Sequence, residues 1–186
     1  PLDPRLYRAF LALPENGSDA LPPEHRYHFT YAGAFFAVLN SNKEIAEQAP
    51  WLEAVLAASD ARWKFLIWHH PAYASKEHRD NAEVRRHWVP LADKYDVDMV
   101  FQGHDHAYLR TKPMRDNAIV DSYEEGIPYI VSTSGTKFYE QMDRDYIEVG
   151  FEEVPTYQVI RIDGGTLTYE ARDTAGEVVD AFTLTE

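Results

Sequence analysis

The sequence predicts an α/β fold with a β-rich C-terminal end, formed by one domain over residues 1–186. Apolar runs typical of buried strands occur at 63–68 and 97–102. Stretches with the apolar spacing of helices, at 44–59 and 81–95, alternate with these runs. After the second run, short segments rich in β-branched and aromatic residues are separated by turn residues. These segments predict mainly antiparallel strands.

The composition limits the class of protein. A chain of 186 residues, 45% hydrophobic and 13% aromatic, is typical of a folded domain with a core. The net charge of −13 argues against nucleic acid or an anionic membrane surface as a partner, and no apolar run approaches the ~20 residues of a membrane helix. The chain has no cysteine, which excludes disulfides and thiolate metal sites.

The N-terminal third predicts a short helix at 5–13 within a proline-rich irregular region. An alternating strand at 27–31 and an apolar run at 34–39 are joined by Ala32-Gly33, which predicts a hairpin leading into a buried strand.

Two prolines fall inside the predicted helices. We expect the helix at 44–59 either to break at Pro50 or to begin there, with Pro50 in its first turn. We expect the helix at 81–95 to kink or break at Pro90.

The C-terminal half predicts short strands joined by turns. The dipeptide Gly164-Gly165 after Asp163 predicts a hairpin, and the long polar and aromatic segment 134–153 predicts a structured surface loop. The predicted strands are 107–111, 127–132, 156–162, 167–171 and 178–184.

Two histidine pairs directly follow predicted buried strands. His69 and His70 follow the strand at 63–68, and His104 and His106 follow the next strand. Open α/β sheets bind ligands at the carboxyl ends of their strands, and imidazole is the commonest metal ligand. This pattern predicts a metal site. The alternative is that these are ordinary surface histidines at strand ends.

The spacing of the histidines suggests which of them bind the metal. On a continuing strand His104 and His106 point to the same face, and Gly103 lets the backbone pass close to another group. His69 and His70 point opposite ways if the backbone is extended. We therefore expect His69 to be a ligand, and His70 to support the ligands or line a pocket wall.

The segments 66–73 and 103–110 read Leu-Ile-Trp-His-His-Pro-Ala-Tyr and Gly-His-Asp-His-Ala-Tyr-Leu-Arg. They resemble the last two signature blocks of calcineurin-like metallophosphoesterases, in the purple-acid-phosphatase-like branch, and weaker similarities extend over nearly the whole chain. The resemblance implies part of a four-layer α/β/β/α metallophosphoesterase sandwich. It also implies hydrolysis of phosphate monoesters or diesters by metal-activated water, and an extracellular or periplasmic location that the residues alone leave unknown.

The resemblance further implies two divalent or trivalent transition-metal ions, Fe, Mn or Zn, in the complete enzyme. His69 and His104 would bind one ion and His106 the other. Paired ions ~3.5–4 Å apart activate water and hold phosphate oxygens. They would also reverse the acidic field that otherwise repels a phosphate ester.

Other residues have both a functional and an ordinary interpretation. The resemblance gives His78 the role of protonating the leaving group, although a loop histidine is otherwise simply solvated. Asp105 either orients an imidazole or faces water. Tyr108 and Arg110 either brace their strand or line the substrate pocket. Lys137, with the neighbouring Tyr139, is expected at the pocket rim.

The chain departs from the family pattern at the ligands that precede these blocks. It contains no Gly-Asp and no Gly-Asn-His, the motifs that supply the bridging carboxylate and further ligands. We therefore expect residues 1–186 to be the C-terminal portion of a catalytic domain, weak or inactive alone. The alternative is a catalytically incompetent folded fragment that binds one ion or none through three histidines. A third alternative is a zinc hydrolase that is not a phosphatase and uses a three-histidine site. It would need Asp105 or Glu77 as its general base.

The expected partner is a phosphate-ester substrate. We also expect the open face of the sheet to be covered by a homodimer or by strand exchange, because uncovered apolar faces and unpaired edges promote association.

Overall fold

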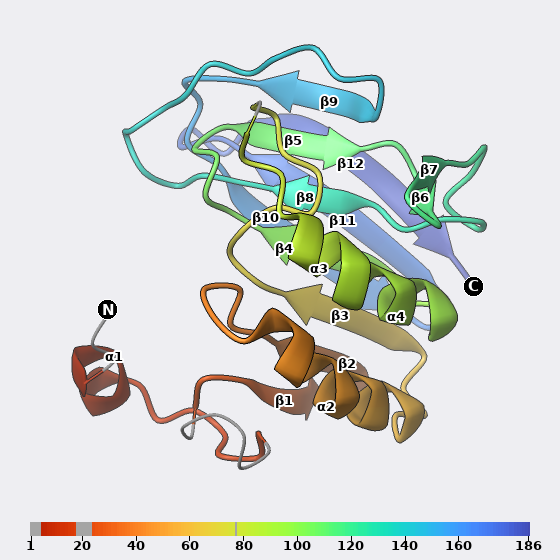
Figure 1. Cartoon of the computed structure of the whole chain (residues 1–186). Coiled ribbons are helices and arrows are strands. Elements are labelled where there is room, and N and C mark those ends of the chain that lie inside the picture. The colour runs from red at the N-terminus through yellow and green to blue at the C-terminus, as the bar shows by residue number, and fades with distance from the viewer. Residues whose placement is uncertain (1–4, 18–23, 77) are drawn as a thin grey trace.

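The computed structural model describes residues 5–17, 24–76 and 78–186, and these form three layers (Figure 1). Helices cover one face of a central seven-stranded sheet, and a three-stranded sheet covers part of the other face. Predictions that concern the remaining residues, including Glu77 as a candidate base, lie outside the described part.

The elements largely follow the predicted order. The helices are α1 Arg5–Phe10, α2 Ile45–Ala57, α3 Ala82–His87 and α4 Val89–Lys94. The central sheet contains, in spatial order, β1 Tyr27–Tyr31, β2 Ala34–Val38, β3 Trp63–Ile67, β4 Met99–Gln102, β8 Tyr129–Val131, β5 Tyr108–Thr111 and β9 Ile147–Phe151. The second sheet is antiparallel and contains β10 Tyr157–Asp163, β11 Thr166–Arg172 and β12 Val178–Thr185. A separate hairpin pairs β6 Met114–Arg115 with β7 Ala118–Ile119.

The parallel part of the sheet explains the buried apolar runs. β2, β3, β4 and β8 pair in parallel, so their carboxyl ends lie at one edge of the sheet, at the left of Figure 1. Leu66 packs among the residues under the helices, whereas the preceding Phe65 packs toward the second sheet. Because both faces are covered, these strands read as nearly continuous apolar runs.

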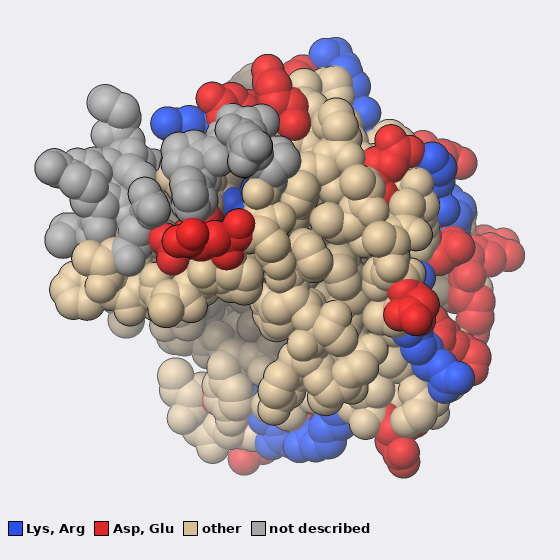
Figure 2. Space-filling view, turned by 90° about the horizontal axis from the view of Figure 1, so that it is seen from below, with Lys and Arg blue, Asp and Glu red and all other residues tan. Residues whose placement is uncertain are grey.

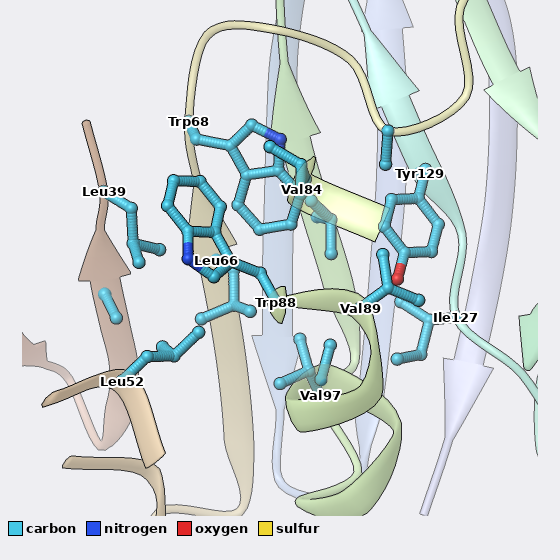
Figure 3. Packing of buried hydrophobic residues seen from close by; sticks show 14 of the residues in the cluster. Leu39, Leu52, Leu66, Trp68, Val84, Trp88, Val89, Val97, Ile127 and Tyr129 are labelled. Carbon is cyan, nitrogen blue, oxygen red and sulfur yellow. The ribbon is translucent and has the colours of Figure 1, made fainter. Parts of the chain in front are cut away.

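The helix side of the core is built around two tryptophans (Figure 3). The Trp68 and Trp88 rings meet edge to face with their centroids 5.3 Å apart, and both side chains are buried. Trp88 Nε1 donates to the Ile45 carbonyl at 2.9 Å, so the break between α3 and α4 is fixed against the start of α2.

The two prolines behave differently. The predicted break near Pro90 is confirmed, because α3 ends at His87 and α4 begins at Val89. The prediction for Pro50 was wrong, since α2 begins five residues earlier and runs through it. The buried Gln48 amide fixes the start of α2 by donating to carbonyls of Asn40, Lys43 and Glu44.

The sequence did not lead us to expect β9 or the β6–β7 hairpin. β9 lies inside 134–153, which was predicted to be a loop, and it pairs with β5. Ile147, Val149 and Phe151 alternate with the exposed Glu148 and Gly150, which is the pattern of a half-buried strand, so the signal was present in the sequence and was overlooked. The β6–β7 hairpin turns at Asp116 and Asn117, whose φ angles of 52° and 59° are those of a type I′ turn.

The predicted turn at Gly164 is confirmed, with β10 and β11 joined there.

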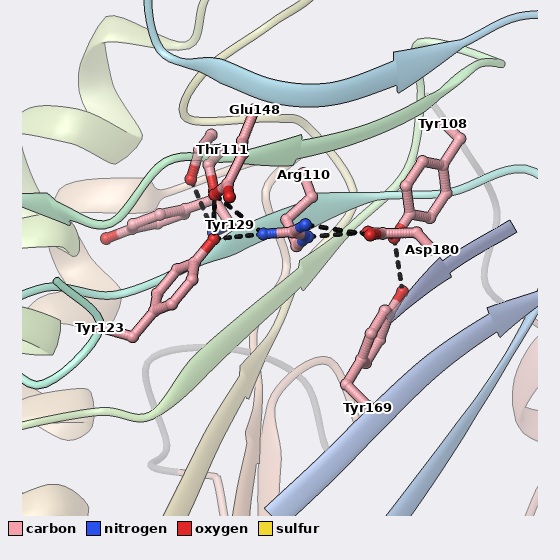
Figure 4. A network of polar contacts seen from close by, with 8 residues as sticks. All are labelled: Tyr108, Arg110, Thr111, Tyr123, Tyr129, Glu148, Tyr169 and Asp180. Atoms are coloured by element: carbon pink, nitrogen blue, oxygen red, sulfur yellow. Dashed lines mark hydrogen bonds and ion pairs between the residues drawn. The ribbon is translucent and has the colours of Figure 1, made fainter. Parts of the chain in front are cut away.

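A buried polar network joins the two sheets (Figure 4). Arg110 on β5 is 4% exposed, and its Nε and Nη2 donate to the two carboxylate oxygens of Asp180 on β12 at 2.7 and 2.9 Å. The Tyr108 hydroxyl donates to the same carboxylate at 2.7 Å and lies 3.1 Å from the Tyr169 hydroxyl. Arg110 Nη1 also pairs with Glu148 at 2.9 Å. The network therefore fixes β12 and β11 over β5.

The second sheet leaves part of the central sheet uncovered. Its buried side chains form one cluster with residues of β2, β3, β4, β5 and β8, whereas Phe29 and Tyr31 on the edge strand β1 remain 37% and 74% exposed. Seen from below, the molecule presents a largely uncharged face (Figure 2). Among the described helices, none is both long and apolar enough to cross a membrane.

Asp98 fixes the register of β3 and β4 at their amino ends. Its carboxylate accepts the Lys64 N–H at 2.6 Å, and its own N–H donates to the Lys64 carbonyl at 2.9 Å. Burial is the main cause that raises the pKa of Asp98 to about 7, and the charge of Glu186 adds to it.

We predict that Asp180→Asn lowers the free energy of unfolding by about 3 kcal/mol, because it leaves a buried guanidinium without its charged partner. Glu148→Gln is the matched control, since it removes a carboxylate from the same guanidinium at a position 40% exposed. We expect the control to cost less than about 1 kcal/mol. Urea unfolding of both variants measures the difference, and equal losses would contradict the assignment.

Candidate metal centre

The histidines follow strands whose pairing continues beyond the strand ends. The Trp68 N–H donates to the Phe101 carbonyl at 3.1 Å, and the Gly103 N–H donates to the His69 carbonyl at 3.0 Å. A Cβ on Gly103 would lie 3.4 Å from His69 Nδ1. Gly103 therefore lies against the His69 ring, at a distance where an added Cβ would make an ordinary van der Waals contact.

Three of the four histidine rings are in contact. His69 Nε2 lies 3.2 Å from His104 Nδ1. The His70 ring centroid is 4.3 Å from that of His104 and 5.1 Å from that of His69. The rings therefore come together from the ends of β3 and β4, as the positions of the strands predict.

His70 is held by a serine from the end of β2. The buried Ser41 hydroxyl oxygen accepts the backbone N–H groups of His70 at 2.9 Å and His69 at 3.2 Å, and it lies 2.9 Å from His70 Nδ1. Because this oxygen already accepts two N–H groups, its own proton can be donated to Nδ1, which places the His70 proton on Nε2. The extended backbone assumed for this pair is not present, since the chain bends at both residues. The bend brings His70 beside His104.

His104 and His106 also depart from the geometry assumed from the sequence. β4 ends at Gln102, and His104 and His106 have left-handed φ angles of 72° and 53°. The His106 ring is directed to the Lys137 carbonyl, 3.0 Å from Nδ1, and to the ring of Tyr139, with a centroid distance of 4.8 Å. Left-handed residues other than glycine cost of order 1–2 kcal/mol each. Surrounding contacts must therefore hold this segment in place.

Asp105 provides those contacts. Its carboxylate accepts the Ser75 N–H at 2.9 Å, the Ser75 hydroxyl at 3.1 Å and Arg79 Nε at 2.8 Å. Arg79 Nη2 also donates to the His104 carbonyl at 2.9 Å. Asp105 is 1% exposed, so the alternative that it faces water was wrong.

The residues fit one ion better than two. Two nitrogens that each lie ~2.0–2.1 Å from the same ion are about 2.9–3.4 Å apart in octahedral or tetrahedral coordination. His69 Nε2 and His104 Nδ1 are 3.2 Å apart, which is within this range. Within the described residues, however, no group of three or more His, Cys, Asp or Glu side chains is arranged to hold a metal ion. His106 would have to turn from Lys137 to become a ligand, and the Asp105 carboxylate is already paired.

The imidazoles near this position are kept neutral. Burial lowers the pKa of His69 and His70, and it lowers that of His104 to about 4, with a further contribution from the charge of Arg79. Neutral imidazole is the form that binds metal ions. The electrostatics of the site therefore favour ligation at neutral pH.

Cations surround Tyr139 beside His106. Lys76 Nζ, Arg79 Cζ and Lys137 Nζ lie 5.5, 5.0 and 5.0 Å from the ring centroid. Lys137, followed by Arg79 and Lys76, lowers the pKa of the Tyr139 hydroxyl. These side chains form a positive patch beside His106. They do not line the cavity beside His69, so the place of Lys137 and Tyr139 at a pocket rim stays a prediction.

The remaining candidates lie in different environments. His78 is exposed on the loop between Lys76 and Arg79, with φ 63°, and its role as a proton donor stays a prediction. Tyr108 and Arg110 are buried between the sheets, where their hydrogen bonds brace β5 against β12.

A cavity of about 820 Å³ opens beside His69. Val38, Ile67 and Phe101, from the carboxyl ends of β2, β3 and β4, form part of its apolar lining. It lies on the same edge of the sheet as the histidine segments.

Residues 2–108 match the family model described as calcineurin-like phosphoesterase. The chain belongs to this family. The uncharacterized protein Rv2577 of Mycobacterium tuberculosis is 29% identical over 136 residues, which cover 62% of this chain and 26% of that protein. Purple acid phosphatase 13 of Arabidopsis thaliana is 36% identical over 113 residues, covering 56% of this chain and 21% of that protein.

Solved structures with this fold agree with the predicted architecture. The purple acid phosphatase PPD1 from yellow lupin superposes with a TM-score of 0.73 at 21% identity, covering 89% of this chain and 34% of that one. GAP50 of Plasmodium superposes with a TM-score of 0.63 at 17% identity, covering 86% and 53%. The predicted metallophosphoesterase fold is therefore confirmed. The chain spans only about a quarter of the length of the curated relatives described above.

We predict that His69→Ala and His104→Ala each weaken Zn²⁺ binding by more than about tenfold, since loss of even a group supporting a ligand costs about 10–100-fold. His87→Ala is the control, because His87 lies on α3 and pairs with Glu83. Equilibrium dialysis of the metal-loaded chain gives the three affinities. An equal affinity for all variants would place the ion elsewhere.

Proposed function

We propose that the complete protein is a metal-dependent phosphoric ester hydrolase that uses metal-activated water. The observation that carries the proposal is the 3.2 Å approach of His69 Nε2 to His104 Nδ1 at the shared edge of the sheet, in a member of the calcineurin-like phosphoesterase family. His69 and His104 would hold one transition-metal ion and His106 would reach a second. The names of the purple acid phosphatase relatives support the class of substrate.

Residues of this chain would position the metal-binding histidines and protonate the leaving group. Metal ions, when bound, supply a water molecule with a lowered pKa. Asp105 and Arg79 hold the His104 segment in its left-handed conformation. The Gly103 N–H donates to the His69 carbonyl at 3.0 Å and so holds the two histidine segments side by side. The exposed His78 is proposed to protonate the oxygen of the leaving group.

An alternative is supported by a specific observation. The carboxylate between the two histidines, Asp105, is occupied by Ser75 and Arg79, so it offers no bridge between two ions. Residues 1–186 alone would then form a folded unit that binds one ion or none and is catalytically incompetent. The same contacts argue against Asp105 as the base of a zinc hydrolase, because its carboxylate is buried and its oxygens already accept three hydrogen bonds from Ser75 and Arg79.

We predict that the chain loaded with Mn, Fe or Zn hydrolyses a generic aryl phosphate orders of magnitude more slowly than a two-metal enzyme. Loss of one ion removes several kcal/mol of transition-state stabilisation, and ~1.4 kcal/mol corresponds to tenfold in rate. Steady-state turnover is measured with His69→Ala as the background control. Turnover that is rapid and depends on His69 would contradict the one-ion alternative. Turnover unaffected by His69→Ala would contradict the proposed function.

We further propose that a second copy of the chain, or an exchanged strand, covers the uncharged face beside β1. The support is the exposure of Phe29 and Tyr31 on β1, which is the edge strand of the central sheet among the described residues, together with the uncharged surface in Figure 2. The outer edge of β1 is partly occupied at His28, whose backbone N–H and carbonyl bond the Asn16 side chain at 3.0 and 2.9 Å. The expected result is a dimer mass in solution that reverts to the monomer mass when Tyr31→Lys is introduced. A wild-type monomer across the concentration range would contradict this proposal.

A further inference from the structure

The Ser41 hydroxyl determines which nitrogen of the His70 ring carries the hydrogen. Its oxygen accepts the backbone N–H groups of His69 at 3.2 Å and His70 at 2.9 Å, and it lies 2.9 Å from His70 Nδ1. A hydroxyl has two acceptor lone pairs and one donor proton. Since the backbone N–H groups take both lone pairs, the proton is what the hydroxyl offers to Nδ1. In the neutral ring Nδ1 is then the acceptor, and Nε2 carries the hydrogen.

Ser41 is held in position from α2. It is 4% exposed. The Gln48 side chain accepts the Asn40 N–H at 3.0 Å and donates to the Asn40 carbonyl at 2.8 Å, and the Asn40 side chain accepts the Asn42 N–H at 3.0 Å. These bonds fix the backbone on both sides of the serine. The fold therefore sets the tautomer of His70 before any ligand binds.

This tautomer excludes His70 as a metal ligand. A metal ion binds a ring nitrogen through its lone pair. In His70 one nitrogen is bonded to Ser41 and the other carries the hydrogen. His69 Nε2 and His104 Nδ1, in contrast, face each other at 3.2 Å, the spacing of two ligands of one ion. His70 is therefore a hydrogen-bond donor beside the two ligands.

The donor lies at the centre of the histidine group. The His70 ring centroid is 4.3 Å from that of His104 and 5.1 Å from that of His69. His70 is half-buried. Of its two ring nitrogens, only Nδ1 has a hydrogen-bond partner in the part of the chain that the structure describes. The acceptor for the Nε2 hydrogen would then come from a ligand bound beside these rings.

We propose that His70 Nε2 donates a hydrogen bond to an oxygen of the phosphate group bound at the candidate metal centre. This inference rests on the proposed function, since the phosphate is that of the ester substrate. Charge spreads over the phosphate oxygens in the transition state of phosphoryl transfer, and a donor that is already oriented stabilises such charge without reorganisation. His70 would be a catalytic residue, and Ser41 would be the positioning residue that orients it.

The tautomer is measured by long-range ¹H–¹⁵N NMR of the metal-free chain at about pH 8, where a histidine with the ordinary pKa of ~6.5 is neutral. We expect His70 to carry a hydrogen on Nε2 and none on Nδ1. Ser41→Ala should give a mixture of both tautomers, whereas Ser41→Thr, which keeps the hydroxyl, should retain the single one. A hydrogen on Nδ1 in the chain with Ser41 would overturn the inference.

Binding of Zn²⁺ and of orthophosphate distinguishes a donor from a ligand. His70→Phe keeps an aromatic ring and removes the donor. We expect it to change Zn²⁺ affinity less than about threefold and to weaken orthophosphate binding to the zinc-loaded chain about tenfold, as for loss of one hydrogen bond to a charged group. His70→Gln, which restores an N–H donor, should recover part of the orthophosphate affinity. His87→Phe on α3 is the matched control and should change neither affinity.

Two results of these titrations would overturn the inference. A loss of Zn²⁺ affinity of more than about tenfold in His70→Phe would show that His70 is a ligand. Unchanged orthophosphate affinity in the same variant would show that it donates no hydrogen bond to the phosphate. Turnover of an aryl phosphate that depends on His69 alongside either result would leave the proposed function standing, so the two failures are distinguishable.

Discussion

The candidate site depends on one buried carboxylate. Asp105 accepts hydrogen bonds from Ser75 and Arg79, residues that lie 30 and 26 positions earlier in the chain. These bonds join the loop after β3 to the loop after β4, and they hold His104 and His106 in left-handed conformations that local sequence does not favour. Arg79 also lies 5.0 Å from the Tyr139 ring centroid, so one ion pair orders both the histidine segment and the cations around that ring.

Local pattern accounts for most of the fold. The apolar runs of β3 and β4 and the turn at Gly164 could be predicted because periodicity and turn chemistry are properties of short segments. The path of α2 through Pro50 could not, because it depends on Gln48 reaching carbonyls in the preceding loop. β9 carries a local signal, the alternation of Ile147, Val149 and Phe151 with exposed residues, and only its partner β5 depends on tertiary contact.

The sequence predicts that the histidines lie at the carboxyl edge of the sheet, but it does not predict how their rings are oriented. The approach of His69 to His104 follows from two parallel strands ending together. The side on which His70 lies, and the direction of His106, depend on bends that Ser41 and Asp105 stabilise from other parts of the chain. The spacing of two residues in His104 and His106 suggested a shared face only because a continuing strand was assumed.

Asp98 has a consequence for how the fold responds to acid. Its folded pKa of about 7 lies above the ordinary value of 3.8, so between these values the folded chain binds more protons at this position than the unfolded chain. The stability that this carboxyl contributes is therefore complete below about pH 4 and is lost as pH rises through about 7. A mildly acidic medium would remove the cost of burying this charge at the end of β3 and β4 opposite the histidines, whereas most paired carboxylates would lose their contribution to stability.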